Sequence, residues 1–472
     1  MLIEPVFAEA ALHPLLKTLE VTQDNLSVVL ENYHNVPNLT FLSLCFDLKQ
    51  QGKIEPQLLK FVGSLQNLTA LKLSSCCTDQ LLAVIGLSCP NLKMFDAESD
   101  THMSMTDKGL AFLVNCQQLQ SVILNDEGTE YDADERYKGI SGQGLANLIV
   151  GLKQLNLLII DPLLLKETIN YLKTFNVHTK TFPLKFLHLR YASKDILMTV
   201  SDMFPQLSTL RLEDPNKDVL HFLSQMNNLD TLTLSCYAWM SLNDVQIQLR
   251  QTVENLKVLT LRNPKILGID INLLKNMGKW CIHLESLTIA VYTEGFLTSA
   301  HHIPDKVKFF PKLKTLMFEG DVSIFLIETF LLSIKTLERL SVYVHGFNFP
   351  SGFMDQLLLN SVKNGNLAQL RFLQFYHWEV SLETLLYLID QSSELRTIWG
   401  LNMLTLSEEA KKTVKDHIQK NNLDIDILDG LAPEPSFGLQ FLDKKHGRLQ
   451  DRLHDYVQQI ELDNILMELS LL

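Results

Sequence analysis

One short apolar pattern recurs along almost the whole of this 472-residue sequence, and it limits the possible folds more than any other feature. The pattern is L-x-x-L-x-L, with conservative changes at its apolar positions, and most neighbouring copies start about 20 to 29 residues apart. The copies start at Leu16, Leu39, Leu68, Leu92, Leu119, Leu155, Leu184, Leu207, Leu229, Leu256, Leu284, Leu313, Leu337, Leu370 and Leu395. Self-similarity at such a period predicts an array of stacked repeats that share one core.

Each copy predicts one strand followed by one helix. The L-x-L alternation is typical of a short strand with one buried face, and the residues after it have helical spacing. About fifteen such units predict an α/β fold, a right-handed leucine-rich repeat solenoid over residues 1–430, with a helical C-terminal extension or cap over 431–472. Strands stack about 4.8 Å apart while helices need about 8 to 10 Å. We therefore expect a horseshoe with parallel strands on the concave face and helices on the convex face.

The unit that ends at Leu119 shows how one repeat is built. Thr106 is a helix N-cap residue, Asp107 lies favourably in the first turn, and Leu110 and Leu113 fall on one helix face. Cys116 then occupies the turn that leads into the next strand, where a small and weakly polar side chain can be buried. After the last copy the strand pattern fades, and we expect a helix over residues 407–420.

The same sequence pattern recurs in other units. Cys89 closes a unit that also opens with Thr-Asp, Cys281 stands in the same phase, and the segment LTALKLSSC ends at Cys76. These units resemble the cysteine-containing leucine-rich repeats of F-box proteins, which are the substrate receptors of cullin–RING ubiquitin ligases. The similarity is closest over residues 68–155. A repeat-like strand near Leu16 leaves no room for a preceding F-box, so we expect the ligase-docking module to be missing from this chain or replaced by another element.

The resemblance implies a protein-interaction module that recognises substrates for an SCF-type cullin–RING ligase and marks them for ubiquitin-dependent degradation. The binding residues of such a solenoid are expected at outward strand positions, because the leucines form the core. A locally basic band and a later group of aromatic side chains stand out, and both types are common at binding hot spots. The predicted partner-binding residues of the concave face are His188, Arg190, Arg211, Arg262, Tyr343, Tyr376 and Trp399.

Two alternatives belong to other functional classes. A GTPase-activating solenoid would carry an acidic tail, whereas the tail DKKHGRLQDRLHDYVQQIELD is mixed in charge. A stand-alone scaffold or inhibitor would bind one partner tightly without any link to degradation. Charge pairing within a solvated face would also explain the basic band, since Glu213 lies two residues after Arg211.

The composition excludes several classes of partner. The net charge is −13 and no block of Lys and Arg stands out, so we expect neither nucleic acid nor an acidic membrane as a partner. The start MLIEPVFAEA lacks the basic and apolar regions of an export signal. Seven cysteines, an odd number, suit a reducing compartment, so we expect the protein in the cytoplasm or the nucleus.

No motif points to catalysis or to a cofactor. The sequence has no His-Glu-x-x-His helix, no Gly-x-Ser-x-Gly elbow and no paired Cys-x-x-Cys units. An acidic insertion over residues 125–136 is expected to form a loop, and its Asp132 and Asp134 lack the further ligands of a calcium loop. His301 and His302 have no partner ligands at suitable spacing. We predict a protein that is not an enzyme and has no metal or cofactor.

Overall fold

The computed structural model describes residues 12–46, 56–74, 76–99, 105–126, 139–160, 162–174, 181–215, 217–235, 254–262, 277–291, 310–320, 322, 324–343, 352–376 and 379–428. The chain forms two compact units, and the division falls between Leu210 and Arg211. The predicted extension over residues 431–472, most of the acidic insertion and the pair His301 and His302 lie outside the described residues.

In the described part of the chain, sixteen strands form one parallel sheet in sequence order. In the first unit these are β1 Thr18–Thr22, β2 Phe41–Cys45, β3 Ala70–Ser74, β4 Met94–Ser99, β5 Ser121–Asp126, β6 Leu157–Ile159 and β7 Phe186–Arg190, and the division between the units lies inside β8 Thr209–Glu213. The second unit continues with β9 Thr231–Ser235, β10 Val258–Arg262, β11 Ser286–Val291, β12 Thr315–Gly320, β13 Arg339–Tyr343, β14 Phe372–Tyr376, β15 Thr397–Trp399 and β16 Asp426–Leu428. The predicted α/β leucine-rich repeat solenoid is confirmed.

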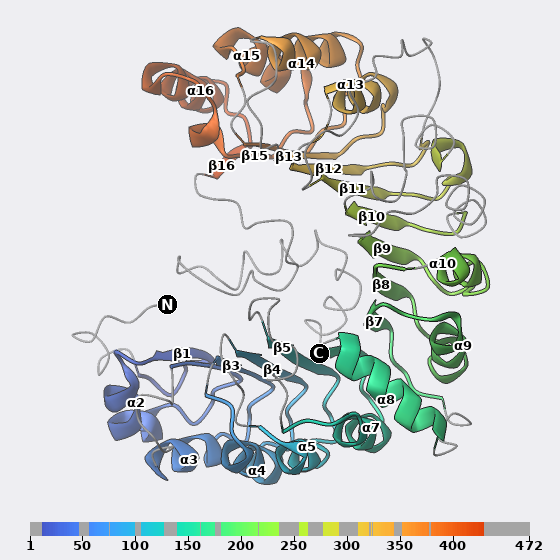
Figure 1. Ribbon diagram of the computed structural model, residues 1–472. Coiled ribbons are helices and arrows are strands. Elements are labelled where there is room, and N and C mark those ends of the chain that lie inside the picture. The colour runs from blue at the N-terminus through green and yellow to red at the C-terminus, as the bar shows by residue number, and fades with distance from the viewer. Residues whose placement is uncertain are drawn as a thin grey trace. The chain divides into compact units, whose positions relative to one another are not determined.

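Helices follow most of these strands and lie on one side of the sheet within each unit (Figure 1). The helices of the first unit are α2 Leu26–Asn32, α3 Pro56–Gly63, α4 Asp79–Ser88, α5 Asp107–Leu113, α7 Gly142–Gly151, α8 Pro162–Thr174 and α9 Lys194–Met203, with the 3-10 turn η2 Tyr33–Asn35. Those of the second are α10 Lys217–Leu223, α13 Ile324–Ser333, α14 Phe353–Lys363, α15 Leu382–Gln391 and α16 Glu408–Lys420, with the 3-10 turn η5 Leu401–Met403.

The leucine positions align from strand to strand, so the outward positions align as well. Leu71 and Leu73 of β3 point into the core and are at most 1% exposed, whereas Ala70, Lys72 and Ser74 belong to the opposite face. The outward positions form three rows across the sheet: the first row contains Ala70, the middle row Lys72 and the third row Ser74. These rows are the surface on which the predicted binding residues lie.

The start of the acidic insertion differs from the sequence-based expectation. The insertion was expected to start at Asn125, but Asn125 and Asp126 extend β5, because β4 is also long enough to pair with them.

The helix expected over residues 407–420 is confirmed as α16, with the Ser407 hydroxyl accepting a hydrogen bond from the backbone nitrogen of Ala410. It is followed by a sixteenth strand, β16, that the L-x-x-L-x-L pattern does not contain.

A carboxylate joins the first turns of successive helices in the first unit. Asp79 of α4 accepts hydrogen bonds from the backbone nitrogen and the hydroxyl of Thr106, both at 2.7 Å, and from the backbone nitrogen of Gly109 at 3.1 Å. Asp107 of α5 accepts in the same way from the backbone nitrogen and the hydroxyl of Ser141, at 2.8 and 2.6 Å. Each carboxylate therefore satisfies donors at the start of the next helix while it lies at the positive end of its own.

Glycines make room for these carboxylates. A Cβ atom at Gly109 would overlap Oδ1 of Asp79, and one at Gly144 would overlap Oδ1 of Asp107. The residue of α4 that corresponds to Gly109 of α5 is Leu81, not a glycine. The helix before α4, α3, has no acidic residue in its first turn that would need the space. In these two pairs of helices, an aspartate at the start of one helix occurs with a glycine in the first turn of the next. Asp355 of α14 instead accepts from the backbone nitrogen of Ser381 at 2.7 Å, although the first turn of α15 has no glycine.

The repeat cysteines belong to the core, as predicted. Cys76, Cys89, Cys116 and Cys281 are 0% exposed, and the Cys116 Sγ lies 3.9 Å from the carbonyl oxygen of Ile85 in the preceding repeat. Burial disfavours the thiolate and raises the pKa of Cys89 to about 12, with a smaller contribution from Cys116, and that of Cys116 to about 11. Such thiols are inert packing groups.

Alkylation should therefore be slow in the folded protein. At pH 8 we expect Cys89 and Cys116 to react with iodoacetamide at least about a hundredfold more slowly than in denaturant, because their raised pKa leaves little thiolate. Mass spectrometry of the labelled peptides, with and without guanidinium, measures the ratio. Rapid labelling of Cys89 in the folded chain would contradict the burial of this residue.

Candidate protein-interaction surface

The predicted binding residues lie on the outward rows of the sheet and differ in exposure. The side chains of His188, Arg211, Arg262 and Trp399 are half-buried. Tyr343 is 8% exposed, so it is buried against its neighbours. Arg190 and Tyr376 are part of β7 and β14, but their side chains lie outside the part that the structure describes.

Two of the arginines of the basic band lie in the second unit, on strands that are not adjacent. Arg211 of β8 places Nη2 2.9 Å from Oε1 of Glu213, so part of its charge is neutralised within its own strand. Arg262 ends β10, and its register partners are Ser235 of β9 and Ala290 of β11. Strand β9 has the sequence TLTLS and carries no charge, so it separates these two cations. His188 lies on β7 of the first unit.

The second unit brings three other outward side chains together across β13, β14 and β15. The guanidinium carbon of Arg339 lies 5.8 Å from the ring centre of Phe372, which is a cation–π distance. The ring of Phe372 meets that of Trp399 edge to face, with centroids 6.5 Å apart and an interplanar angle of 65°. We call Arg339, Phe372 and Trp399 the aromatic patch.

Polar side chains lie beside the aromatic patch in the middle row, and tyrosines continue the third row. The hydroxyl of Ser341 donates to Oε1 of Gln374 at 3.0 Å, and both residues are buried. Tyr343 of β13 is the register partner of Tyr376 of β14. The surface over β13–β15 therefore carries aromatic, amide and guanidinium groups in neighbouring rows, held by strands that pair in register.

Two members of the aromatic patch were missed by the sequence analysis. Arg339 and Phe372 occupy the first outward row, which immediately precedes L-x-L, whereas only the two later outward positions of each copy supplied candidates. The signal was present in the sequence, since an arginine and a phenylalanine stand at the same position of consecutive copies. That Phe372 contacts both Arg339 and Trp399 follows only from the pairing of β13, β14 and β15, in which Phe372 is the register partner of Arg339 and Gln374 that of Trp399.

This combination of side chains is typical of protein binding sites. Arginine and aromatic side chains dominate binding hot spots because they bury large flat areas and can stack or donate hydrogen bonds. Among the residues that the structure describes, no group of three or more His, Cys, Asp or Glu side chains is placed to hold a metal ion. Likewise, no helix in the described ranges is long and apolar enough to span a membrane.

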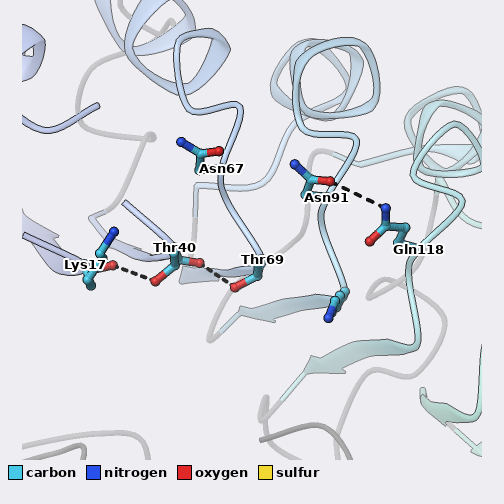
Figure 2. A pocket seen from close by; sticks show the side chains of 7 residues that line it. Lys17, Thr40, Asn67, Thr69, Asn91 and Gln118 are labelled. Carbon is cyan, nitrogen blue, oxygen red and sulfur yellow. Dashed lines mark hydrogen bonds between the residues drawn. The ribbon is translucent and has the colours of Figure 1, made fainter. Parts of the chain in front are cut away.

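A second surface feature lies at the edge of the first unit where strands β1–β5 begin. Figure 2 shows a polar pocket of about 500 Å³ that is lined by Lys17, Thr40, Asn67, Thr69, Asn91, Lys93 and Gln118. Its lining contains two lysines, three amides and two threonines, and no carboxylate. None of these residues belongs to the predicted binding set.

Comparison with solved structures gives matches at low identity and low TM-score. No protein-family model matches the chain, and no curated protein sequence matches it. One similar structure is the leucine-rich repeat-containing protein LegL7 from Legionella pneumophila, with 12% identity and a TM-score of 0.35, covering 77% of this chain and 94% of that one. Another is the complex of Rad7 and Elc1 in yeast, with 18% identity and a TM-score of 0.37, covering 64% of this chain and 80% of that one.

Proposed function

We propose that this protein is a recognition module that binds a partner protein on the outward face of its sheet. The observation that carries the proposal is the aromatic patch, in which Phe372 contacts Arg339 on one side and Trp399 on the other. The repeat leucines are buried in the core, so binding energy must come from the outward rows. The remaining predicted residues, His188, Arg190, Arg211, Arg262, Tyr343 and Tyr376, extend this proposed surface along the sheet.

The aromatic patch suits a rigid binding surface. Its three side chains come from three adjacent parallel strands, whose register fixes their spacing. The contacts with Phe372 restrict Arg339 and Trp399 before a partner arrives, which lowers the entropy that binding must overcome. Because Phe372 is only 8% exposed, a partner segment would bury an aromatic, proline or aliphatic side chain mainly against the half-buried Trp399.

The finer proposal is that the bound partner is a substrate of a cullin–RING ubiquitin ligase. It rests on the resemblance of the cysteine-containing units to the repeats of F-box proteins. The burial of Cys89 and Cys116 in the turns before β4 and β5 agrees with the packing that this subtype of repeat requires.

A tagged pull-down of the full chain from cells with a blocked proteasome tests the finer proposal. Recovery of a cullin scaffold, identified by mass spectrometry, is the expected result. Recovery of one or a few partners without any ligase component would overturn the ligase assignment and support a stand-alone scaffold or inhibitor. Stimulated GTP hydrolysis by a recovered GTPase would instead establish the GTPase-activating alternative.

The recovered partner then tests the aromatic patch. We expect Trp399→Ala to weaken its affinity by about thirtyfold, which corresponds to a hot-spot loss of about 2 kcal/mol. The matched control is Tyr387→Ala, which removes a half-buried aromatic ring from α15 on the helical side of the same repeat. Isothermal titration calorimetry measures both affinities, and circular dichroism checks the fold. Equal affinities for the Trp399 variant and the wild type would show that the partner binds elsewhere.

A further inference from the structure

A polar pair lies between two apolar side chains in the middle row of the second unit. The successive members of that row on β12–β15 are Met317, Ser341, Gln374 and Trp399, which are register partners from strand to strand. Met317 and Trp399 are half-buried, whereas Ser341 and Gln374 are each 7% exposed. The row therefore presents an apolar, two polar and one further apolar side chain in that order.

The amide of Gln374 is held in one orientation, and only its oxygen is used. Oε1 accepts the hydroxyl proton of Ser341, with the two oxygens 3.0 Å apart, so Nε2 lies on the other side of the amide group. Within the described residues, no hydrogen bond is made by the two N–H groups of Nε2. Nε2 is also not among the fully enclosed polar atoms of these residues, so a bound group can reach it.

The pair has unused hydrogen-bonding capacity of both kinds. Nε2 of Gln374 has two donors, and Oγ of Ser341 keeps lone pairs after it donates to Gln374. These groups lie on adjacent strands, β13 and β14. Asn and Gln side chains are complementary to them, because their amides carry an acceptor and a donor on neighbouring atoms of one planar group.

We propose that this row binds an extended segment of the partner protein with an Asn or Gln midway between two apolar residues that are four positions apart. The inference rests on the proposed function, since it specifies what the surface around the aromatic patch recognises. The amide of the bound side chain accepts from Nε2 of Gln374 and donates to Oγ of Ser341. The two apolar side chains of the segment pack on Trp399 and Met317.

The spacing of the row favours an extended segment over a helix. Met317 and Trp399 belong to strands that are three strand spacings apart, or about 14 Å. In an extended segment, residues four positions apart share one face and are about 13 Å apart, with the residue midway on the same face. Residues that share one face of a helix recur seven or eleven positions apart, or about 10.5 and 16.5 Å, and neither distance matches.

The polar pair also predicts which central residues are rejected. A carboxylate would accept from Gln374, but it carries no donor for Ser341. A leucine would leave both residues without a partner and would keep their polar atoms from water. A site built for hydrogen bonding rejects an analogue that lacks the bonding group. We therefore expect Ser341 and Gln374 to determine specificity, and Trp399 to supply most of the affinity.

The test selects peptides on the full chain from a phage-displayed random library. Peptides of about 12 residues are long enough to cross the four strands. We expect the enriched sequences to carry two apolar residues four positions apart with Asn or Gln midway between them. Fluorescence anisotropy of the best peptide, synthesised with a label, measures its affinity. Replacement of its central Asn or Gln by Leu or by Asp should weaken binding at least about tenfold.

Variants of the protein assign the effect to the polar pair. Gln374→Met keeps the side-chain length and removes the amide, and Ser341→Ala removes the hydroxyl, so each should weaken peptide binding about tenfold. The matched control is Thr260→Val, which removes a buried hydroxyl from the same row on β10. This control should leave the affinity within about twofold, because Thr260 lies several strands away from the pair. Circular dichroism checks the fold of each variant.

Binding that is lost in Trp399→Ala but unchanged in Gln374→Met and Ser341→Ala would overturn this inference and leave the proposed function intact. Enriched peptides with apolar residues at helical spacing would also overturn it. So would a selection that yields no peptide sensitive to Trp399→Ala. The proposed surface is tested by a separate measurement, the affinity of the partner recovered in the pull-down for the Trp399 variant, so the two failures are distinguishable.

Discussion

Replacement of Gly86 by alanine is expected to lower the free energy of unfolding of the first unit by about 2 to 3 kcal/mol. Gly86 lies in α4, and a Cβ atom there would overlap the backbone carbonyl oxygen and carbon of Phe112 in α5. A backbone group cannot rotate away as the end of a side chain can. The two helices would have to separate, and adjacent repeats would lose the packing that stabilises both.

The matched control is Gly63→Ala at the end of α3. A Cβ atom at Gly63 would lie 3.3 Å from Cγ1 of Val84 and 3.7 Å from Oγ of Ser88, contacts that small side-chain shifts can relieve. Alanine also favours the helix, so stability should stay within about 1 kcal/mol of the wild type. Urea unfolding followed by circular dichroism measures both variants. Equal stability of the Gly86 and Gly63 variants would show that α4 and α5 are not in close contact.

The second large effect is expected for Asp79→Ala. This change removes the acceptor for three hydrogen bonds of the next repeat, from the nitrogen and hydroxyl of Thr106 and the nitrogen of Gly109. Bonds to a charged acceptor are worth more than neutral ones, and the donors stay part-buried after its loss. We expect the free energy of unfolding to fall by about 2 to 4 kcal/mol. Hydrogen exchange should increase at the backbone amides of Thr106 and Gly109.

Asp195→Ala provides the comparison. Asp195 also lies in the first turn of a helix, α9, and its side chain is exposed. Its loss should cost only the interaction with the helix dipole, about 0.3 to 1 kcal/mol. If the two aspartate variants were equally stable, the bonds between repeats would contribute nothing beyond that interaction.

Much of the fold was predictable because the repeat signal is local. L-x-x-L-x-L places two core leucines within one strand, and this pattern located β1–β15 without knowledge of any partner. The helix cap Thr106 was also predicted, since a cap residue bonds to its own first turn. The strand β16 was missed, because Asp426, Ile427 and Leu428 do not follow the repeat spacing.

The binding surface was only partly predictable. Trp399 was identified as an outward aromatic residue, and the structure places it against Phe372 in the aromatic patch. Arg211 was grouped with Arg262 as a basic band, with charge pairing to Glu213 as the alternative, and the structure shows the Arg211–Glu213 ion pair. The uncharged strand β9 between the two arginines follows from the order of the strands in the sheet.

By itself the sequence determined what each repeat contains: a strand, most often a helix, in a few repeats a buried cysteine in the turn, and the side chains that point out of the sheet. Only the tertiary structure decided what each repeat contacts. Asp79 reaches Thr106, and Arg339 reaches Phe372, across loops of unequal length. Local periodicity sets the conformation of a segment, but contacts between repeats depend on how neighbouring strands pair and how closely their helices pack. Strand pairing and helix packing between repeats are established only when the repeats stack on one another.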